Sequence, residues 1–201
     1  AASDVYKRQL YYCPQIWCSD DTDAVERTTI QYGTSFFYPI SAVGSHVSAV
    51  PNHQTGRITP LETRAVTAMA GSFGYELDLN TLSDSEKEQV KNQIVRFKKD
   101  GPLIHNGIYY RLSNPMTDKL AAWEFVSEDR REALVGGVVF RTEPNSLQYR
   151  IKLRGLIPEA KYSLLESGEC YTGNALMSGG VLLPKTWGDY APIELHFTAQ
   201  T

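Results

Sequence analysis

The chain has 201 residues, of which 42% are hydrophobic and 21% are charged, and its formal net charge is -3 at pH 7. This composition is typical of a globular protein, and no apolar run approaches the roughly 20 residues that a membrane-spanning helix needs. A pI of about 5.8 also removes the general electrostatic attraction to phosphate backbones that nucleic-acid binding uses. The sequence therefore predicts a globular protein without a membrane or nucleic-acid partner.

The three cysteines, Cys13, Cys18 and Cys170, are odd in number and scattered along the chain. They form neither a disulfide framework nor the ligand spacing of a zinc site. We therefore expect a reducing compartment, the cytoplasm, and no metal or other cofactor.

The first nine residues, AASDVYKRQ, contain no apolar signal core, and Ser3 to Gln9 look like the in-frame translation of a transposon-end sequencing adapter. We treat residues 1–9 as an artefact. The natural protein is then expected to continue upstream of Leu10, and the chain to be a fragment. On that interpretation the missing signal peptide says nothing about secretion.

Two βα units are predicted in the first half of the chain. Gln15 to Cys18 reads as a strand, and Asp23 with Glu26 has the spacing of a capping box before a helix that Gly33 weakens. A short strand near Tyr38 then leads into a Gly-, Ser- and Pro-rich loop, and a second helix is predicted from Pro60 to Gly71.

A third helix is predicted from the capping box Ser83-Asp84-Ser85-Glu86 to Gly101-Pro102, which should end it. His46 and His53 fall in the loop of the second unit, and their spacing fits no helical pair of metal ligands. We interpret them as structural histidines that hydrogen-bond to backbone, although a loop at the catalytic face of a barrel could also touch substrate.

Short β-rich runs separated by turns take over after about Leu103, which predicts an antiparallel sandwich. The predicted fold is therefore α/β plus all-β: residues 10–103 form the C-terminal part of a (β/α)8 (TIM) barrel, and residues 104–201 form the sandwich. Two or three βα units cannot close such a barrel alone. His105, His196 and Trp123 are interpreted as sheet or core residues.

Three acids crowd the loop before the first helix. Asp23 is best explained as the N-cap of that helix. Asp20 and Asp21 could be surface anions that gain from the positive end of the helix dipole. However, Asp20 follows a strand at its carboxyl end, where βα barrels collect catalytic groups, and Trp17 lies three residues before it. An indole and a second carboxylate would both raise the pKa of a carboxyl group, as a general acid requires.

These residues also carry a family resemblance. IWCSDDTDAVER, IQYGTSFFYPISAVGSHVSAVPNHQTGR and AGSFGYELDL resemble the C-terminal part of the catalytic barrel of glycoside hydrolase family thirty-six, the microbial α-galactosidases or melibiases. The resemblance runs from about Leu10 to about Leu103. The β-rich remainder is similar to the small C-terminal β-sandwich domain of that family.

The resemblance implies a retaining mechanism on terminal α-linked galactose, as in melibiose and raffinose, with an α-galactoside oligosaccharide as the partner. It implies that Asp20 is the general acid/base and that Trp17 lines the sugar pocket. The family's nucleophilic aspartate belongs to an earlier barrel strand that this sequence does not contain. Because a retaining glycosidase needs two carboxyl groups about 5 to 5.5 Å apart, the chain is expected to be inactive alone.

Other interpretations stay open at this point. The β-rich half could serve as a non-catalytic carbohydrate-binding or scaffold module, with the acids merely capping a helix. The same fold could also hydrolyse α-N-acetylgalactosaminides or transfer galactose. The sequence leaves the oligomeric state open, including a homo-oligomer.

Overall fold

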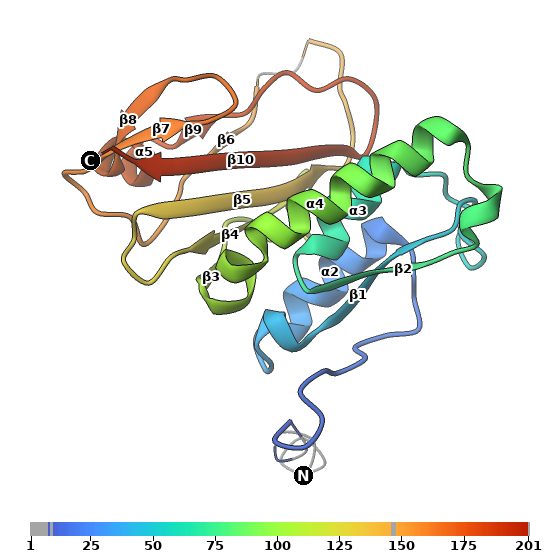
Figure 1. Ribbon diagram of the computed structural model, residues 1–201. Helices are drawn as coiled ribbons and strands as arrows, with labels where there is room; N and C mark the ends of the chain where they lie inside the picture. Colours follow the sequence, from blue (N-terminus) through green and yellow to red (C-terminus); the bar gives the residue numbers. More distant parts are fainter. Residues whose placement is uncertain (1–7, 9, 146–147, 201) are drawn as a thin grey trace. The chain divides into compact units, whose positions relative to one another are not determined.

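The computed structural model describes Arg8 and residues 10–145 and 148–200 (Figure 1). The predicted artefact, residues 1–9, lies outside this part of the chain except for Arg8. The chain divides into two compact units, Ala1–Phe97 and Lys98–Thr201, which are described separately. The domain limits expected from the sequence, 10–103 and 104–201, stay a prediction.

The first unit alternates helices with two parallel strands, β1 and β2, paired from Gly44↔Ser72 to Ser48↔Glu76. Residue Ile16 adds one parallel bridge to Val43. The elements are α2 (Ala24–Thr34), the 3-10 turn η1 (Ile40–Ala42), β1 (Gly44–Ser48), α3 (Leu61–Met69), β2 (Ser72–Glu76), η2 (Leu79–Thr81) and α4 (Asp84–Asn106), of which α4 continues into the second unit.

The core of the first unit forms because α3 and α4 turn one apolar stripe each toward β1. Val47 of β1 is fully buried at its centre. The buried members of this cluster are Val47, Leu61, Ala65, Ala68, Met69 and Val90. The alternating βα order is confirmed, but the described residues supply two paired strands and no closed barrel.

Three sequence predictions for these elements are corrected. The strand predicted at Gln15 to Cys18 is reduced to the single bridge at Ile16. The second strand begins at Gly44 and not near Tyr38, so that His46 lies in a strand and not in a loop. Helix α4 runs through Gly101-Pro102 to Asn106, because Ile104 in the last turn is buried and its packing outweighs the local cost of the proline.

The second unit is built on a six-stranded antiparallel sheet in the order β3-β4-β5-β10-β7-β8, of which β4, β5 and β10 form the centre (Figure 1). A separate two-stranded pair, β6-β9, contributes to the same hydrophobic core. The elements are β3 (Ile108–Arg111), β4 (Leu120–Val126), β5 (Glu132–Val139), β6 (Arg150–Ile151), β7 (Lys161–Leu164), β8 (Cys170–Thr172), α5 (Gly173–Ser178), β9 (Val181–Leu182) and β10 (Ala191–Ala199).

The predicted antiparallel sheet is thus confirmed, while the second layer of the expected sandwich is a short strand pair accompanied by α5. The sequence prediction missed β8 and α5. Trp123 is buried, as expected of a core residue, whereas His105 lies in α4 and not in a strand. In the part of the chain that the structure describes, no helix combines the length and the apolar character needed to cross a membrane.

Candidate active site

The segment around Ile16 runs alongside β1 and sets the position of the candidate catalytic residues. The N–H of Ile16 donates to the carbonyl of Ala42 at 2.7 Å, and the N–H of Gly44 donates to the carbonyl of Ile16 at 2.8 Å. Because these two bonds make Ile16 parallel to β1, the chain leaves in the direction of the carboxyl ends of the strands. Asp20 follows four residues later, on the side where βα proteins place catalytic groups.

Trp17 lies over the backbone of Gly44 because that residue has no side chain. A Cβ atom at Gly44 would come within 3.1 Å of Cε3 of the indole. The indole also packs against His46, with ring centroids 4.8 Å apart, and the guanidinium of Arg27 lies 5.9 Å from its centre. It nevertheless stays 49% exposed, which leaves indole surface free to contact a ligand.

Asp20 and Trp17, the two residues predicted from the sequence, are in direct contact. The indole Nε1–H donates a hydrogen bond of 2.9 Å to Oδ1 of Asp20. This bond fixes the orientation of an exposed carboxyl group and leaves its Oδ2 available to a ligand. The structure therefore brings together a proton-transfer group and an aromatic surface at the strand ends.

Arg27, which the sequence analysis did not single out, supports this arrangement from inside the unit. Its side chain is 5% exposed and donates from one guanidinium nitrogen to the carbonyl of Ser19 at 3.0 Å and from the other to the carbonyl of Gly44. It therefore links the loop that carries Asp20 to the strand beneath Trp17. Its place on the first turn of an amphipathic helix gave no signal of this role.

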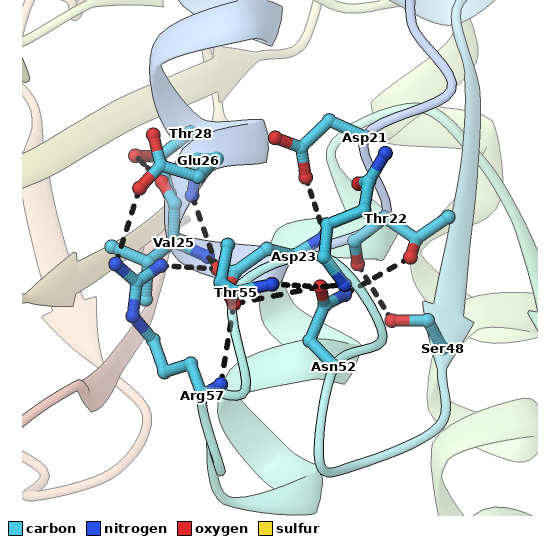
Figure 2. A network of polar contacts seen from close by, with 11 residues as sticks. Asp21, Thr22, Asp23, Val25, Glu26, Thr28, Ser48, Asn52, Thr55 and Arg57 are labelled. Atoms are coloured by element: carbon cyan, nitrogen blue, oxygen red, sulfur yellow. Dashed lines mark hydrogen bonds and ion pairs between the residues drawn. The ribbon is translucent and has the colours of Figure 1, made fainter.

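Asp23 is the N-cap of α2, as predicted (Figure 2). Its Oδ1 accepts the backbone N–H groups of Val25 at 2.8 Å and Glu26 at 3.3 Å. Thr55 donates its hydroxyl to Oδ2, and Arg57 forms an ion pair with Oδ1 at 2.6 Å. Burial opposes ionisation, but these four donors outweigh it and lower the pKa of Asp23.

The same network holds the loop on both sides of Asp23. Asp21 accepts the backbone N–H of Asp23 at 2.9 Å. Ser48 donates its hydroxyl to the carbonyl of Thr22 at 2.6 Å, and the amide of Asn52 donates to the Thr22 hydroxyl at 3.0 Å (Figure 2). Asp21 and Asp23 therefore hold the loop in its conformation. Of the three acids, Asp20 is the one hydrogen-bonded to a side chain of the candidate site, the Trp17 indole.

His46 lies in the middle of β1, between Trp17 and the backbone of Gly74. Burial lowers its pKa, the positive charge of Arg27 lowers it further, and Glu76 acts in the opposite direction. His46 is thus a neutral ring at neutral pH that backs the indole. His53 is exposed in the following loop.

No group of metal-ligating side chains converges near Asp20 in the described chain. The one such group among the described residues, Asp100, Glu194 and His196, belongs to the second unit. The candidate site of the first unit offers a carboxyl group for proton transfer and an exposed indole for contact with an apolar surface such as a sugar face. Because βα barrels place catalytic groups at the carboxyl ends of their strands and glycosidases use carboxyl groups as acid and base, the site fits the class of glycoside hydrolases.

The comparisons with known proteins agree with this class. The profile of the Melibiase family matches residues 5–107, which is more than half of the chain, and the profile of the glycosyl hydrolase family 36 C-terminal domain matches residues 120–197. The chain belongs to the melibiase family, the α-galactosidases of glycosyl hydrolase family 36. The family predicted from the sequence is confirmed.

Two bacterial α-galactosidases are among the similar proteins. The bifunctional α-galactosidase/sucrose kinase AgaSK of Mediterraneibacter gnavus is 56% identical over 189 residues, which cover 94% of this chain and 20% of that protein. Alpha-galactosidase AgaA of Geobacillus stearothermophilus is 49% identical over 181 residues, covering 90% of this chain and 25% of that protein. The chain thus spans about a quarter of the length of these relatives.

Solved structures of the same family have the same fold over this segment. The galactosidase domain of AgaSK gives a TM-score of 0.94 at 55% identity, covering 96% of this chain and 27% of that chain. A variant of AgaA from Geobacillus stearothermophilus, solved in complex with raffinose, gives a TM-score of 0.92 at 45% identity over 96% of this chain and 27% of that chain.

Proposed function

We propose that this chain is part of a retaining α-galactosidase that hydrolyses terminal α-galactosyl residues of oligosaccharides such as melibiose and raffinose, and that Asp20 is its general acid/base. The observation that carries the proposal is the 2.9 Å hydrogen bond from the Trp17 indole to the Asp20 carboxylate at the strand ends. The α-galactosidase relatives, one of them solved with raffinose, support the substrate class.

In the proposed first step, a nucleophilic carboxylate attacks the anomeric carbon while Asp20 gives its proton to the glycosidic oxygen, which leaves as an alcohol. In the second step, the ionised Asp20 takes a proton from water as the water oxygen attacks the anomeric carbon and releases the enzyme carboxylate. Because the indole engages Oδ1, Oδ2 is the oxygen that carries the proton in this proposal.

The nucleophile is proposed to come from sequence outside this chain. Asp21 accepts a backbone N–H within its own loop, and Asp23 caps α2 and pairs with Arg57. Neither is available to stand about 5 to 5.5 Å from Asp20 across a glycosidic bond, as a retaining mechanism requires. The 201 residues alone are therefore proposed to bind galactosides weakly at best and to turn none over.

Two further aspects stay proposals. A reducing, cytoplasmic setting is supported by the three free cysteines, Cys13, Cys18 and Cys170. We also propose that the enzyme prefers galactosides to α-N-acetylgalactosaminides and hydrolyses them in preference to transferring galactose. The α-galactosidase relatives support both preferences. Assays with α-N-acetylgalactosaminides and with sugar acceptors, alongside raffinose, test them.

The test uses a hybrid enzyme in which this chain replaces the matching quarter of AgaA from Geobacillus stearothermophilus. We expect the hybrid to hydrolyse both raffinose and p-nitrophenyl α-galactoside. Asp20→Asn should lower kcat/KM for raffinose by about 10³-fold, because a sugar leaving group needs a proton, whereas the first step with the activated aryl substrate should change far less. The control Asp78→Asn, at an exposed turn, should leave both rates unchanged.

Raffinose hydrolysis at the hybrid's full rate in the Asp20→Asn variant would contradict the role of Asp20. Equal losses on both substrates with an unchanged unfolding temperature would also contradict it, because they would indicate binding and not acid catalysis. Turnover of raffinose by the 201-residue chain alone would contradict the proposed origin of the nucleophile.

A further inference from the structure

We propose that Asp100 of α4 and Glu194 and His196 of β10 bind one divalent transition-metal ion, for which Zn²⁺ is the probe. One donor atom from each of these three side chains lies within 4.8 Å of the other two. All three belong to the second unit, in which no function has been assigned above. Glu194 and His196 are two residues apart in a strand whose burial alternates, so their side chains lie on the same face of the sheet.

The imidazole and the carboxylate stand at the separation that two ligands of one ion have. Nε2 of His196 is 3.3 Å from Oδ1 of Asp100. Two donors each about 2.1 Å from a tetrahedral Zn²⁺ lie about 3.4 Å apart. Nε2 is also buried and makes no directed hydrogen bond among the described residues. The two groups are therefore in contact at a separation that one bound ion could also span.

Glu166 occupies the position of the outer partner that metal-bound histidines usually have. Its carboxylate lies 3.4 Å from Nδ1 of His196 and accepts the backbone N–H of the same residue at 3.0 and 3.1 Å. A carboxylate on Nδ1 fixes the ring and leaves Nε2 as the ligand atom. The ring is thus oriented toward Asp100 before any ion arrives.

Burial and access are both suited to an ion. Asp100 is 7% exposed, and among the described residues its carboxylate contacts the side chain of His196 alone, although an ionised carboxylate inside a protein normally has several partners. Asp100 and His196 line a cavity of about 280 Å³, through which a hydrated ion could reach them. One imidazole and two carboxylates suit Zn²⁺ or Mn²⁺ and leave a fourth position for water.

Proton competition gives the site a pH signature. Burial opposes protonation of His196, but its contacts with Asp100 and Glu166, together with the charge of Glu194, raise its pKa to about 9. Lys99 and Glu132 also line the cavity. An ion that binds Nε2 takes the place of a proton on that nitrogen, so the affinity should increase with pH.

The experiment is isothermal titration of the whole chain with ZnCl₂, without a histidine tag. Cys13, Cys18 and Cys170 are first replaced by serine, so that thiolates do not bind zinc. We expect one ion per chain at pH 8, with the affinity for Zn²⁺ increasing with pH as stated. His196→Gln should weaken binding by about 100-fold or more, and Glu166→Gln by about 10-fold to 100-fold.

His105→Gln is the matched control, because His105 is an exposed histidine on the same helix as Asp100 and should leave binding unchanged. Glu194→Gln, in a half-buried position, serves as a second ligand variant if His196→Gln unfolds, and circular dichroism verifies the fold of each variant. Zn²⁺ affinity that is equal in Glu194→Gln and the parent would overturn the site. So would one-to-one binding weaker than about 1 mM at pH 8. None of these results bears on Asp20.

Discussion

Two buried carboxyl groups in different regions of the molecule respond to burial in opposite ways. Asp23, in the loop before α2, is 2% exposed and has a lowered pKa. Glu124, in the centre of β4, is fully buried, and its burial raises its pKa to about 8. Burial alone would raise the pKa of both groups.

The number of hydrogen-bond donors that each region can offer accounts for the difference. Asp23 accepts from two backbone N–H groups, a hydroxyl and a guanidinium. Glu124 accepts only the N–H of Arg154, at 2.8 Å, and its Oε1 has no partner among the described residues. A helix start has free N–H groups to offer, whereas β4 pairs on both sides with β3 and β5 and uses its own backbone donors there.

The largest effect is expected from removing Asp23. Asp23→Ala should lower the free energy of unfolding by about 3 kcal/mol, because it removes an N-cap and leaves Arg57 without its closest ion-pair partner. Urea unfolding followed by circular dichroism measures this change.

Asp78→Ala is the control for this substitution. Asp78 also caps a turn, η2, but it is exposed, and among the described residues its carboxylate accepts from Asn80 alone. We expect a loss of about 0.5 kcal/mol there. If Asp23→Ala were as mild as the control, the donors around Asp23 would not stabilise the loop as described.

A slightly smaller effect is expected from the pH dependence that Glu124 contributes. Between pH 5 and 7 the folded chain keeps the proton of Glu124 while the unfolded chain, whose glutamate has the ordinary pKa near 4.5, has lost it. Stability should therefore fall as the pH rises, by about 1.4 kcal/mol per unit and about 2.7 kcal/mol over this interval.

The Glu124→Gln variant should lose this slope, which unfolding experiments at pH 5, 6 and 7 would show. Glu132→Gln, at the exposed start of the neighbouring strand β5, should keep it. If the free energy of unfolding changed with pH in the same way in the parent and in the Glu124→Gln variant, Glu124 would be ionised in the folded chain, contrary to this prediction.

The smallest expected effects come from two glycines of the first unit and should have opposite signs. Gly44→Ala should destabilise by about 1 kcal/mol, because the new methyl group meets the Trp17 indole at 3.1 Å and the carbonyl of Ile16 at 3.2 Å. Gly33→Ala should stabilise by about 0.5 to 1 kcal/mol, since Gly33 lies in α2 with nothing within 4 Å of the added atom.

Thermal unfolding of both glycine variants measures the two signs, and tryptophan fluorescence reports on the displaced indole. A neutral Gly44→Ala variant with unchanged fluorescence would show that the close approach of Trp17 to the strand is not required.

Local chemistry explains which parts of the fold the sequence predicted. The starts of α2 and α4 were predicted because Asp23 and Ser83 carry their capping partners within three residues. The end of α4 was not, since the burial of Ile104, a tertiary property, carries the helix past Pro102. Similarly, β8 and α5 have only short local signals, such as the cap formed by Thr172.

The sequence could likewise predict only part of the candidate active site. Asp20 and Trp17 are three residues apart, so the sequence could pair them, and the structure shows that they are hydrogen-bonded. The support from Arg27 and the stacking of His46 depend on the strand that passes beneath the loop.

The cluster of Asp100, Glu194 and His196 joins residues almost a hundred positions apart, and no spacing rule could have indicated it.

The most direct test of the proposed role of Asp20 is the stereochemistry of azide rescue in the Asp20→Asn hybrid. Azide needs no base, so it can attack the galactosyl-enzyme intermediate that accumulates from p-nitrophenyl α-galactoside. We predict restored turnover with α-galactosyl azide as the product, because two inversions retain the configuration. Formation of β-galactosyl azide, which arises from a single inversion, would identify Asp20 as the nucleophile and contradict the account.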